Sequence, residues 1–490
     1  MKRIYIVAIL IAFLSSCSKD FLETFPTDGL DVQMVFTSTD NGWGALNGIH
    51  RLMYTNWQGD QWYGGEGSIM HCLDVMGEDV ILPARANGYF VAQLQWLDHT
   101  SETGHYSKFV WDFYYKIISN ANNIIGSIDE AVGTQSDKNI IKGEALAYRA
   151  WAHWKLVQLF GKRYVKDGDN SNLGVPIMTY ESPEAKARNS VEEVYHLVNN
   201  DLDEAIGLLD GYSRINKSHI DKSVAQGIKA RVLLTQQYWE EAADMAMEAA
   251  TNYSFMSTND HFTGYNDYTN PEWMWGSKVV NDQSQTYGSF FAYMGANYFS
   301  RGVKGAPRVI NILLYNQISN NDIRKTKLWV ASPQPGTVII PDGGVTFPYM
   351  HQKFMGESET SSAGSIPYMR VAEMYLIAAE GYAKANKTEE ARDALYDLMR
   401  TRNPLYLKSS LSGTALVNEI LVARRVELWG EGVRFIDLKR LDQKLNRTGT
   451  NCVSSVTGAV YEVEPGDSRW QWKIPKTSET DANPNIIQNP

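Results

Sequence analysis

The densest group of charged side chains in the sequence lies in RRVELWGEGVRFIDLKR, at residues 424–440. Glu427, Glu431 and Asp437 alternate there with arginines and a lysine. A facing pair of carboxylates can hydrolyse a glycosidic bond. Acidic and basic side chains that alternate at helical spacing, however, usually pair with one another. We therefore predict an ion-paired network in this segment and no catalytic residue.

Other catalytic and cofactor patterns are missing from the sequence. It has no G-x-S-x-G nucleophile turn, no H-E-x-x-H pair and no glycine-rich phosphate loop. His153 lies between two tryptophans in RAWAHWKLV, which predicts a core histidine with satisfied hydrogen bonds. We expect no cofactor and no catalytic metal, and the sequence leaves open whether a structural calcium ion is bound.

The three cysteines are Cys17, Cys72 and Cys452, and none of them forms a C-x-x-C pair. This number is too small for a disulfide framework, and the spacing does not suggest zinc. If Cys17 is used separately, Cys72 and Cys452 can either pair with each other or remain as two isolated thiols.

Aromatic side chains are abundant, with 14 Trp and 27 Tyr, and many lie in two segments that are rich in turn residues. The apolar face of a sugar ring can stack on Trp or Tyr while nearby polar groups hold its hydroxyls. The alternative is that these rings pack the two segments onto the rest of the protein. We expect packing for most single rings and exposure for at least two members of the set. The members in residues 55–104 are Trp57, Trp62, Tyr63, Tyr89, Phe90 and Trp96; those in 252–365 are Tyr265, Tyr268, Trp273, Trp275, Tyr287, Phe290, Phe291, Tyr293, Tyr298 and Phe299.

The rest of the chain must form the scaffold that holds these two turn-rich segments. Its apolar residues recur at the spacing of amphipathic helices. The segment from Ser190 opens with a capping box completed by Glu193, and Gly161 suits the end of the helix before it. The helical stretches are 108–131, 137–161, 190–209, 222–237, 239–253, 368–386, 387–403 and 414–432. This pattern predicts a mostly α fold, with a helical scaffold at about 105–251 and 366–440 and loop-rich insertions at about 55–104 and 252–365.

Two parts of the scaffold repeat one pattern. AQGIKARVLLTQQYWEEAADMAMEAA and AEMYLIAAEGYAKANKTEEARDALYDLM each contain an Ala-rich helix, a tight turn, the letters E-E-A and a second Ala-rich helix. This is typical of tetratricopeptide-like helical hairpins, in which small residues let paired helices approach closely. Such hairpins form a scaffold and give no indication of catalysis.

The N-terminus predicts export. Lys2 and Arg3 precede an apolar run of about eleven residues, which is a signal-peptide layout and is shorter than the roughly 20 residues of a membrane-spanning helix. Leu14-Ser15-Ser16-Cys17 resembles a bacterial lipobox, so we expect a signal peptide at 1–16, a lipidated Cys17, a polar tether over 17–31 and a folded domain over 32–490. An ordinary signal peptide that happens to contain a cysteine is the alternative.

The overall charge excludes one class of partner. The formal net charge is −10 and the pI is near 5.5. Nucleic-acid binding requires a basic face that neutralises phosphates, so we expect no nucleic acid as a partner.

Several segments together resemble the SusD/RagB-type outer-membrane nutrient-binding lipoproteins. The resemblance runs nearly from end to end of the chain, in the family's order. The segments that carry it are SSCSKDFLETFPTDGL, YYKIISNANNII, GEALAYRAWAHWKLVQLFG, GVPI, IPYMRVAEMYLIAAEGYAKAN, RRVELWGEGVRFIDLKR and the terminal NPNIIQNP. The resemblance implies a tetratricopeptide-like fold with four helical hairpins, a surface-exposed lipoprotein held at the outer membrane, and a SusC-like TonB-dependent transporter as partner. It implies glycan capture for import and no covalent chemistry.

Ligand residues follow from the resemblance only in part. In the starch-binding archetype an aromatic arc draws a Trp from the first insertion and a Tyr from a turn in the second, which here correspond to Trp96 and to Tyr287 in QTYGS. No second Trp of the arc has a counterpart after Phe299, so starch is not implied as the ligand. We expect Trp96 and Tyr287 to stack on the glycan, with further candidates behind them. These candidates are the aromatic residues Trp62 and Tyr89 and the polar residues Asp74, Arg85 and Gln93.

Three functions are compatible with these residues. A glycan-binding lipoprotein that is not an enzyme fits the whole pattern. A surface glycosidase or peptidase would need two facing carboxylates, or a nucleophile and a base, within the insertions. A peptide-binding member of the same family would also line its site with aromatic side chains.

Overall fold

The structure is a computed structural model, and it describes residues 36–180, 184–283, 286–334 and 336–490. The predicted signal peptide, Cys17 and the tether lie outside the described residues. No helix in the part of the chain that the structure describes is both long and apolar enough to cross a bilayer.

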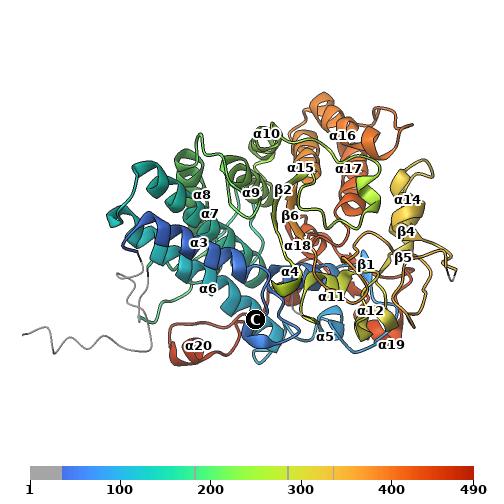
Figure 1. Cartoon of the computed structure of the whole chain (residues 1–490), viewed down its shortest axis with the longest axis horizontal. Coiled ribbons are helices and arrows are strands. Elements are labelled where there is room, and N and C mark those ends of the chain that lie inside the picture. Colours follow the sequence, from blue (N-terminus) through green and yellow to red (C-terminus); the bar gives the residue numbers. More distant parts are fainter. Residues whose placement is uncertain (1–35, 181–183, 284–285, 335) are drawn as a thin grey trace, which may run out of the picture.

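Long helices form the scaffold and cross the molecule in chain order, from α6–α8 on the left of Figure 1 to α15–α17 on the right. All eight helical stretches expected from the sequence are confirmed, and α3 precedes them. The scaffold helices are α3 (Thr39–Leu52), α6 (His105–Ser127), α7 (Gln135–Phe160), α8 (Val191–Leu208), α9 (Lys222–Thr235), α10 (Trp239–Ala250), α15 (Val371–Lys384), α16 (Thr388–Arg402), α17 (Gly413–Glu427) and α18 (Arg434–Arg440). The predicted caps are confirmed as well, because Ser190 and Glu193 form a reciprocal capping box and Gly161 caps α7.

The two repeated hairpins, α9–α10 and α15–α16, turn in the same way. Gln237 and Asn386 lie three residues before the Glu-Glu-Ala sequence and have left-handed backbones, with φ of 68° and 64°. The residue after each donates its backbone N–H five residues back, from Tyr238 to Leu233 at 3.0 Å and from Lys387 to Tyr382 at 2.8 Å. This bond is the one that closes a helix C-terminus at a left-handed residue. The sequence repeat is therefore also a structural repeat.

The hairpins stack because small residues face one another. Helix α10 packs on both α9 and α15. At Gly381 of α15, a Cβ atom would lie 2.3 Å from the carbonyl oxygen of Trp239 and 2.9 Å from Cβ of Ala243. Such distances are shorter than van der Waals contact, so only glycine allows these two helices to approach this closely.

The first insertion contains a buried helix that the sequence predicted as irregular. All twelve residues of α4 (Gly65–Met76) are buried. Because α4 is covered on every side, it has no polar face and therefore no amphipathic period to detect. Its polar side chains find partners inside the protein; for example, Glu66 forms an ion pair with Lys155 at 2.9 Å. The other elements of this insertion are η2 (Trp57–Gly59), β1 (Val80–Ile81) and α5 (Val91–Leu94).

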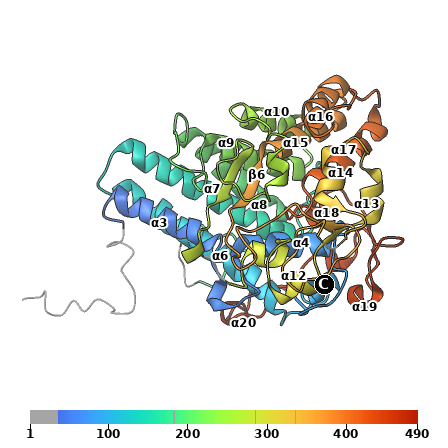
Figure 2. The same ribbon diagram turned by 45° about the vertical axis from the view of Figure 1, so that its right-hand side comes forward.

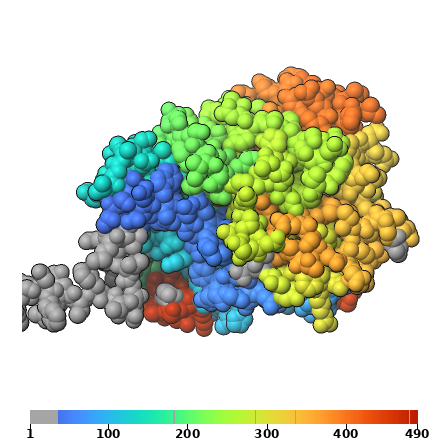
Figure 3. Space-filling view, in the orientation of Figure 1, coloured from blue at the N-terminus to red at the C-terminus, as the bar shows by residue number. Residues whose placement is uncertain are grey.

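The second insertion is built from short elements, and two of its strands join it to the first insertion and to the scaffold. β1 of the first insertion pairs antiparallel with β3, in a four-stranded sheet of order β1-β3-β5-β4. β2 pairs antiparallel with β6, which leads directly into α15 of the scaffold. Figure 3 shows the blue residues of the first insertion directly against the yellow-green residues of the second. The strands are β2 (Trp273–Ser277), β3 (Val309–Ile310), β4 (Trp329–Val330), β5 (Met350–His351) and β6 (Ile366–Arg370), and the helices are α11 (Phe290–Met294), α12 (Arg301–Gly305), α13 (Ile312–Gln317) and α14 (Ile323–Leu328).

The chain after α18 adds a small C-terminal part with few regular elements. β7 pairs antiparallel with β8. Asn489 then ties the terminus to the scaffold, because its side-chain amide donates to the carbonyl oxygen of Phe160 at 2.8 Å. The elements are β7 (Leu445–Asn446), α19 (Ser454–Thr457), β8 (Glu462–Val463) and α20 (Ser478–Ala482).

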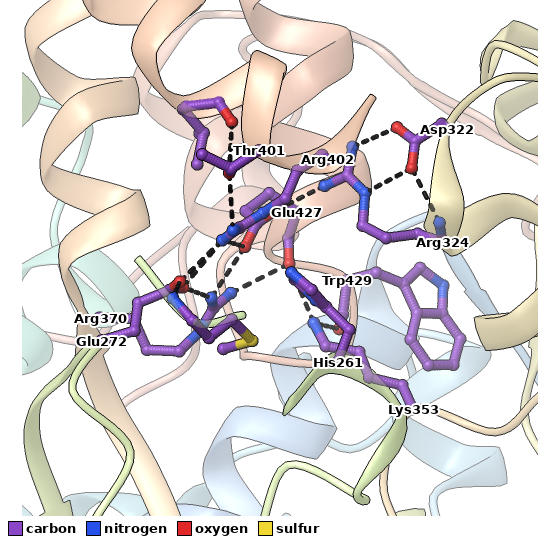
Figure 4. A network of polar contacts seen from close by, with 12 residues as sticks. His261, Glu272, Asp322, Arg324, Lys353, Arg370, Thr401, Arg402, Glu427 and Trp429 are labelled. Atoms are coloured by element: carbon purple, nitrogen blue, oxygen red, sulfur yellow. Dashed lines mark hydrogen bonds and ion pairs between the residues drawn. The ribbon is translucent and has the colours of Figure 1, made fainter. Parts of the chain in front are cut away.

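A buried ion-pair network connects the second insertion to the scaffold (Figure 4). Glu427, the last residue of α17, accepts from Arg370 at 2.8 Å and from Arg402 at 3.0 Å, and it also pairs with Arg324. Arg402 reaches Glu272 at 2.8 Å. The network holds four cations and four carboxylates, so its formal charges cancel. Its members are Arg324, Lys353, Arg370, Arg402, Glu272, Asp322, Glu427 and Glu431.

The network confirms the prediction of ion pairing in 424–440 and extends it to other segments. Burial alone would raise the pKa of Glu427, but the guanidinium groups of Arg402, Arg370 and Arg324 hold this pKa well below its usual range. Asp437 is buried too and accepts from Arg424 and Arg440 at 2.8 Å each. These carboxylates are charged, enclosed and fully paired, so their role is structural.

We expect the Glu427→Gln variant to lose about 3–5 kcal/mol of its free energy of unfolding, because it leaves three buried guanidinium groups short of one carboxylate. Urea denaturation measures the loss. The matched control is Glu462→Gln, which breaks a pair with Lys444 whose side chains are 46% and 34% exposed. An exposed pair contributes about 0–1 kcal/mol, so equal losses in the two variants would contradict the structural role of the network.

Candidate functional site

An open groove of about 700 Å³ lies where the two insertions meet. Its walls come from four loops or short helices: the chain after η2, the loop between β1 and α5, the segment around α11 and α12, and the loop between β4 and β5. The residues that line it are Gln61, Ala86, Asn87, Tyr89, Tyr287, Phe299, Ser300, Arg301, Lys304, Gly305, Gly343 and Val345. Its volume and open mouth suit a ligand that enters from solvent.

Aromatic rings from both insertions face this groove. Tyr89 comes from the first insertion, and Tyr287 and Phe299 come from the second. Tyr287 is 38% exposed, and its ring centroid lies 5.9 Å from that of Phe299. Trp62 packs behind Tyr89, with ring centroids 4.7 Å apart, and is half-buried. Each of the two insertions therefore contributes aromatic rings to the groove.

Hydrogen bonds fix the orientation of Tyr89. Its hydroxyl donates to the side-chain oxygen of Gln61, and the hydroxyl of Tyr293 donates to the backbone carbonyl of Gln61 at 2.6 Å. Burial, followed by the charge of Asp60, raises the pKa of Tyr89 above its ordinary value. The phenol stays protonated at neutral pH and presents a defined ring face.

Close backbone approach holds the two insertions together at the groove. A Cβ atom on Gly302 would lie 3.1 Å from the side-chain oxygen of Asn87, and one on Gly305 would lie 3.1 Å from Cβ of Ala86. Helix α12 can therefore lie directly on the loop at 85–89. Val345 donates its backbone N–H to the carbonyl oxygen of Lys304 at 2.9 Å, and this bond joins the loop between β4 and β5 to α12. Figures 1 and 2 both place α12 in the lower right part of the molecule, and Figure 1 shows it near α11 and near α5 of the first insertion.

The prediction for Trp96 is wrong. Trp96 is only 2% exposed, its indole N–H donates to the carbonyl oxygen of Met76 at 2.9 Å, and its ring packs on Phe435 and Trp470. A ring that is covered on both faces cannot stack on a ligand. Trp96 lies in the first insertion, but its backbone is left-handed, with φ of 54°, and its ring is buried in the core.

The predictions for Asp74 and Gln93 as ligand residues are also wrong, because both side chains are buried. Asp74 lies in α4, and its carboxyl accepts from the backbone N–H of Gly432 at 2.7 Å. Burial raises the pKa of Asp74 to about 8, so the group is largely protonated at neutral pH. Gln93 is 4% exposed, within α5. Neither side chain can reach the groove.

Arg85 lies beside the groove but outside its lining. It is exposed, and its guanidinium donates to the carbonyl oxygen of Ser455 at 3.4 Å. Its neighbours Ala86 and Asn87 do line the groove. Of the seven predicted ligand residues, the structure therefore brings Tyr89 and Tyr287 together in the groove and places Trp62 and Arg85 at its edge.

Sequence reasoning missed the polar residues of the groove. Gln61, Asn87, Arg301 and Lys304 all line it. Arg301 and Lys304 belong to α12, whose five residues are too few to show any period. Only the fold brings α12 beside the loop at 85–89, so no signal in the sequence could have identified these residues.

One group of side chains in the described part of the chain could hold a metal ion. The donor atoms of His50, Glu144 and His219 lie within 4.8 Å of one another, and all three residues are buried. Glu144 is already satisfied, because His219 lies 2.9 Å from one of its oxygens and the N–H of Ile220 donates to the other at 3.0 Å. Burial lowers the pKa of His50 and keeps it neutral. His219 and Glu144 are thus hydrogen-bonded in the core, and His50 lies beside them with its Nε2 3.6 Å from Glu144.

The remaining expectations concern His153 and the cysteines. His153 is fully buried and lies 2.9 Å from the carbonyl oxygen of Arg149, which confirms a core histidine. Cys72 and Cys452 are both free, so the alternative of two separate thiols is the correct one. Cys72 is buried and Cys452 is partly buried.

Comparison with known proteins covers nearly the whole chain. A family profile described as "Starch-binding associating with outer membrane" matches residues 76–234. A profile described as "SusD family" matches residues 235–490, which is more than half of the chain.

Individual relatives agree with these profiles. The SusD-like protein P2 of Formosa agariphila is 23% identical over 476 residues, which cover 90% of this chain and 91% of that protein. The crystal structure of a SusD-like carbohydrate-binding protein from Bacteroides vulgatus is similar with a TM-score of 0.78 and 27% identity, covering 92% of this chain and 98% of the other. A laminarin-binding SusD-like protein has the same fold, with a TM-score of 0.70, 18% identity and coverage of 93% and 100%.

The burial of Asp74 predicts a pH-dependent effect. Its folded-state pKa of about 8 lies above its unfolded value. Between about pH 4 and pH 8 the folded state therefore holds a proton that the unfolded state releases, and this group's contribution to stability falls as pH rises, by up to about 1.4 kcal/mol per pH unit. Because an asparagine side chain does not titrate, we expect the Asp74→Asn variant to gain in stability relative to the wild type as pH is raised from 5 to 8. Denaturant unfolding at several pH values measures this difference.

The Asp74→Ala variant is the control for the hydrogen bond. It leaves the N–H of Gly432 without an acceptor and adds a cost of about 1–3 kcal/mol at every pH. A stability difference between Asp74→Asn and the wild type that stays constant with pH would contradict the raised pKa.

Proposed function

This chain belongs to the SusD family, and from that premise we propose that it is a surface-exposed outer-membrane lipoprotein that binds glycans. Its ligand is an oligosaccharide or polysaccharide held in the groove between the two insertions. It passes the ligand to a SusC-like TonB-dependent transporter for import and catalyses no reaction itself.

The observation that carries this proposal is the presence of Tyr89 and Tyr287 in the lining of one open groove. The two rings come from segments nearly 200 residues apart and remain accessible, although about half of the aromatic side chains of the insertions are buried. Tyrosine suits a carbohydrate site because its ring offers an apolar face while its hydroxyl can hydrogen-bond. Gln61, Asn87 and Ser300 supply further polar groups for sugar hydroxyls.

Hydrolysis is the main alternative, and the composition of the groove disfavours it. Glycosidases place two carboxyl groups across the scissile bond, about 5–10 Å apart. None of the described residues that line the groove is Asp or Glu. The carboxylates of the segment at 424–440 are held in buried ion pairs. Incubation with the bound glycan should therefore release no sugar, and the appearance of products would favour the enzyme.

A peptide ligand is the second alternative, since aromatic walls also bind peptides. The laminarin-binding neighbour and the carbohydrate-binding neighbour from B. vulgatus favour a sugar. Laminarin is consequently a sensible first probe within a glycan array, with a peptide library as the competing arm.

The lipid anchor and the transporter partner rest on the lipobox and on the family. Cys17 would carry the lipid, and the tether at 17–31 would let the folded body lie over a transporter. The surface position follows from the same reasoning, because captured glycan has to be handed to a protein that crosses the membrane.

We expect Tyr89→Ala and Tyr287→Ala each to weaken binding of the best glycan from the array by about 1–2 kcal/mol, or roughly 5–30-fold in Kd, because each removes one stacking face. Isothermal titration calorimetry measures the change. Tyr180→Ala is the matched control, because Tyr180 is 53% exposed and does not line the groove. Unchanged affinity in both groove variants would place the binding site elsewhere.

A further inference from the structure

The groove has a charge opposite to that of the chain as a whole. Arg301 and Lys304 line it from α12, three residues apart, and therefore lie on one face of that helix. Arg301 is exposed and Lys304 is half-buried. Neither side chain has an ion-pair or hydrogen-bond partner among the described residues. The formal net charge of the chain is −10, so two unpaired cations side by side in one groove are a local exception.

No carboxylate in the described lining neutralises these cations. Three acidic residues lie next to the lining: Asp60 and Asp342 directly precede Gln61 and Gly343 in the chain, and the backbone carbonyl of Glu359 accepts from the N–H of Phe299 at 2.9 Å. Asp60 accepts from the backbone N–H of Trp62 at 2.8 Å, and Glu359 accepts from the N–H of Asp342 at 3.0 Å. Asp342 is exposed and forms no ion pair with Lys304, although it precedes Gly343 of the groove wall.

An arginine and a lysine in this setting can recognise an acidic group. A guanidinium matches a carboxylate or a sulfate with two parallel hydrogen bonds, and an ammonium adds a mobile point charge. The stacking rings Tyr89 and Tyr287 lie in the same groove, so one sugar unit can place its ring on a tyrosine and its acidic substituent on α12. A neutral glycan would leave both cations without a counter-charge.

We propose that this groove selects acidic glycans, in which carboxylate or sulfate groups pair with Arg301 and Lys304 while Tyr89 and Tyr287 stack on the sugar rings. The inference rests on the proposed glycan-binding function and adds the chemical class of the ligand. Carboxylate and sulfate share the required charge and geometry, so the experiment separates them.

The test compares each acidic polysaccharide with its own neutral form. Full-length protein in detergent is titrated with polygalacturonate and carboxyl-reduced polygalacturonate, and with dextran sulfate and dextran. We expect at least one acidic form to bind about tenfold or more tightly than its neutral counterpart, and the preference to shrink as salt rises from about 0.05 to 0.5 M, because exposed charges are screened. Preference within the first pair indicates uronate recognition, and preference within the second indicates sulfate.

The deciding variant is Arg301→Gln/Lys304→Gln, and its matched control is Lys116→Gln/Lys327→Gln. Lys116 on α6 and Lys327 on α14 are exposed and lie outside the groove, so both double variants change the net charge from −10 to −12. We expect the groove variant to lose the acidic preference and the control to keep it, with unchanged melting temperatures. Equal affinity for acidic and neutral forms, or an acidic preference that survives the groove variant, would overturn the inference.

The outcomes also separate this inference from the proposed function. Suppose that the wild type binds neutral glycans, that the tyrosine variants lose this binding, and that Arg301→Gln/Lys304→Gln leaves it unchanged. Glycan binding by the groove then stands, and the inference of an acidic ligand is wrong. If the acidic preference disappears equally in the groove variant and the control, the attraction is non-specific and the inference falls. If no glycan of either class binds, both proposals fall together.

Discussion

The burial of eight ionised groups in one network is the constraint on which the rest of the structure depends. An enclosed charge is tolerated only when it is paired and hydrogen-bonded, so every member must keep its partners. The members come from different places: Arg370, Arg402 and Glu427 lie at the ends of scaffold elements, whereas Glu272 and Arg324 belong to the second insertion. A displacement of the insertion would expose or separate several pairs at once. The network therefore fixes where a loop-rich segment lies on a helical scaffold.

That fixed position has a consequence for the groove. Loops as long as the second insertion would ordinarily move, and binding would then cost the entropy of ordering them. Here the insertion is held by the network on one side, by the β1–β3 pairing on another and by α12 lying on the loop at 85–89. Tyr89 and Tyr287 are thereby held in one groove. The proposed site is preorganised, although each of its walls is a loop or a very short helix.

The sequence predicts the scaffold well and the groove poorly, for a physical reason. The long helices, the capping box at Ser190 and the ion pairs of 424–440 are encoded by local spacing, which is visible along the chain. The exposure of a ring is decided by segments far away in sequence. Trp96 and Tyr287 looked equivalent as aromatic residues in turn-rich insertions, but Trp470 and Phe435 cover the first, whereas nothing covers the second to the same degree. Helix α4 escaped detection because complete burial removes the amphipathic period.

The burial of the tryptophans also changes what the aromatic richness of the chain means. Ten of the fourteen tryptophans are buried, and these are Trp96, Trp111, Trp151, Trp154, Trp273, Trp275, Trp329, Trp429, Trp470 and Trp472. The largest rings thus fill the space between scaffold and insertions, where irregular loops leave gaps that small side chains could not fill. The groove is left with two tyrosines and one phenylalanine, and rings of this kind can stack on many different sugars. In the proposed function, stacking alone would therefore give the groove affinity with little discrimination. Discrimination among glycans would then come from the polar side chains beside the rings, and the only charged ones in the described lining are Arg301 and Lys304 of α12.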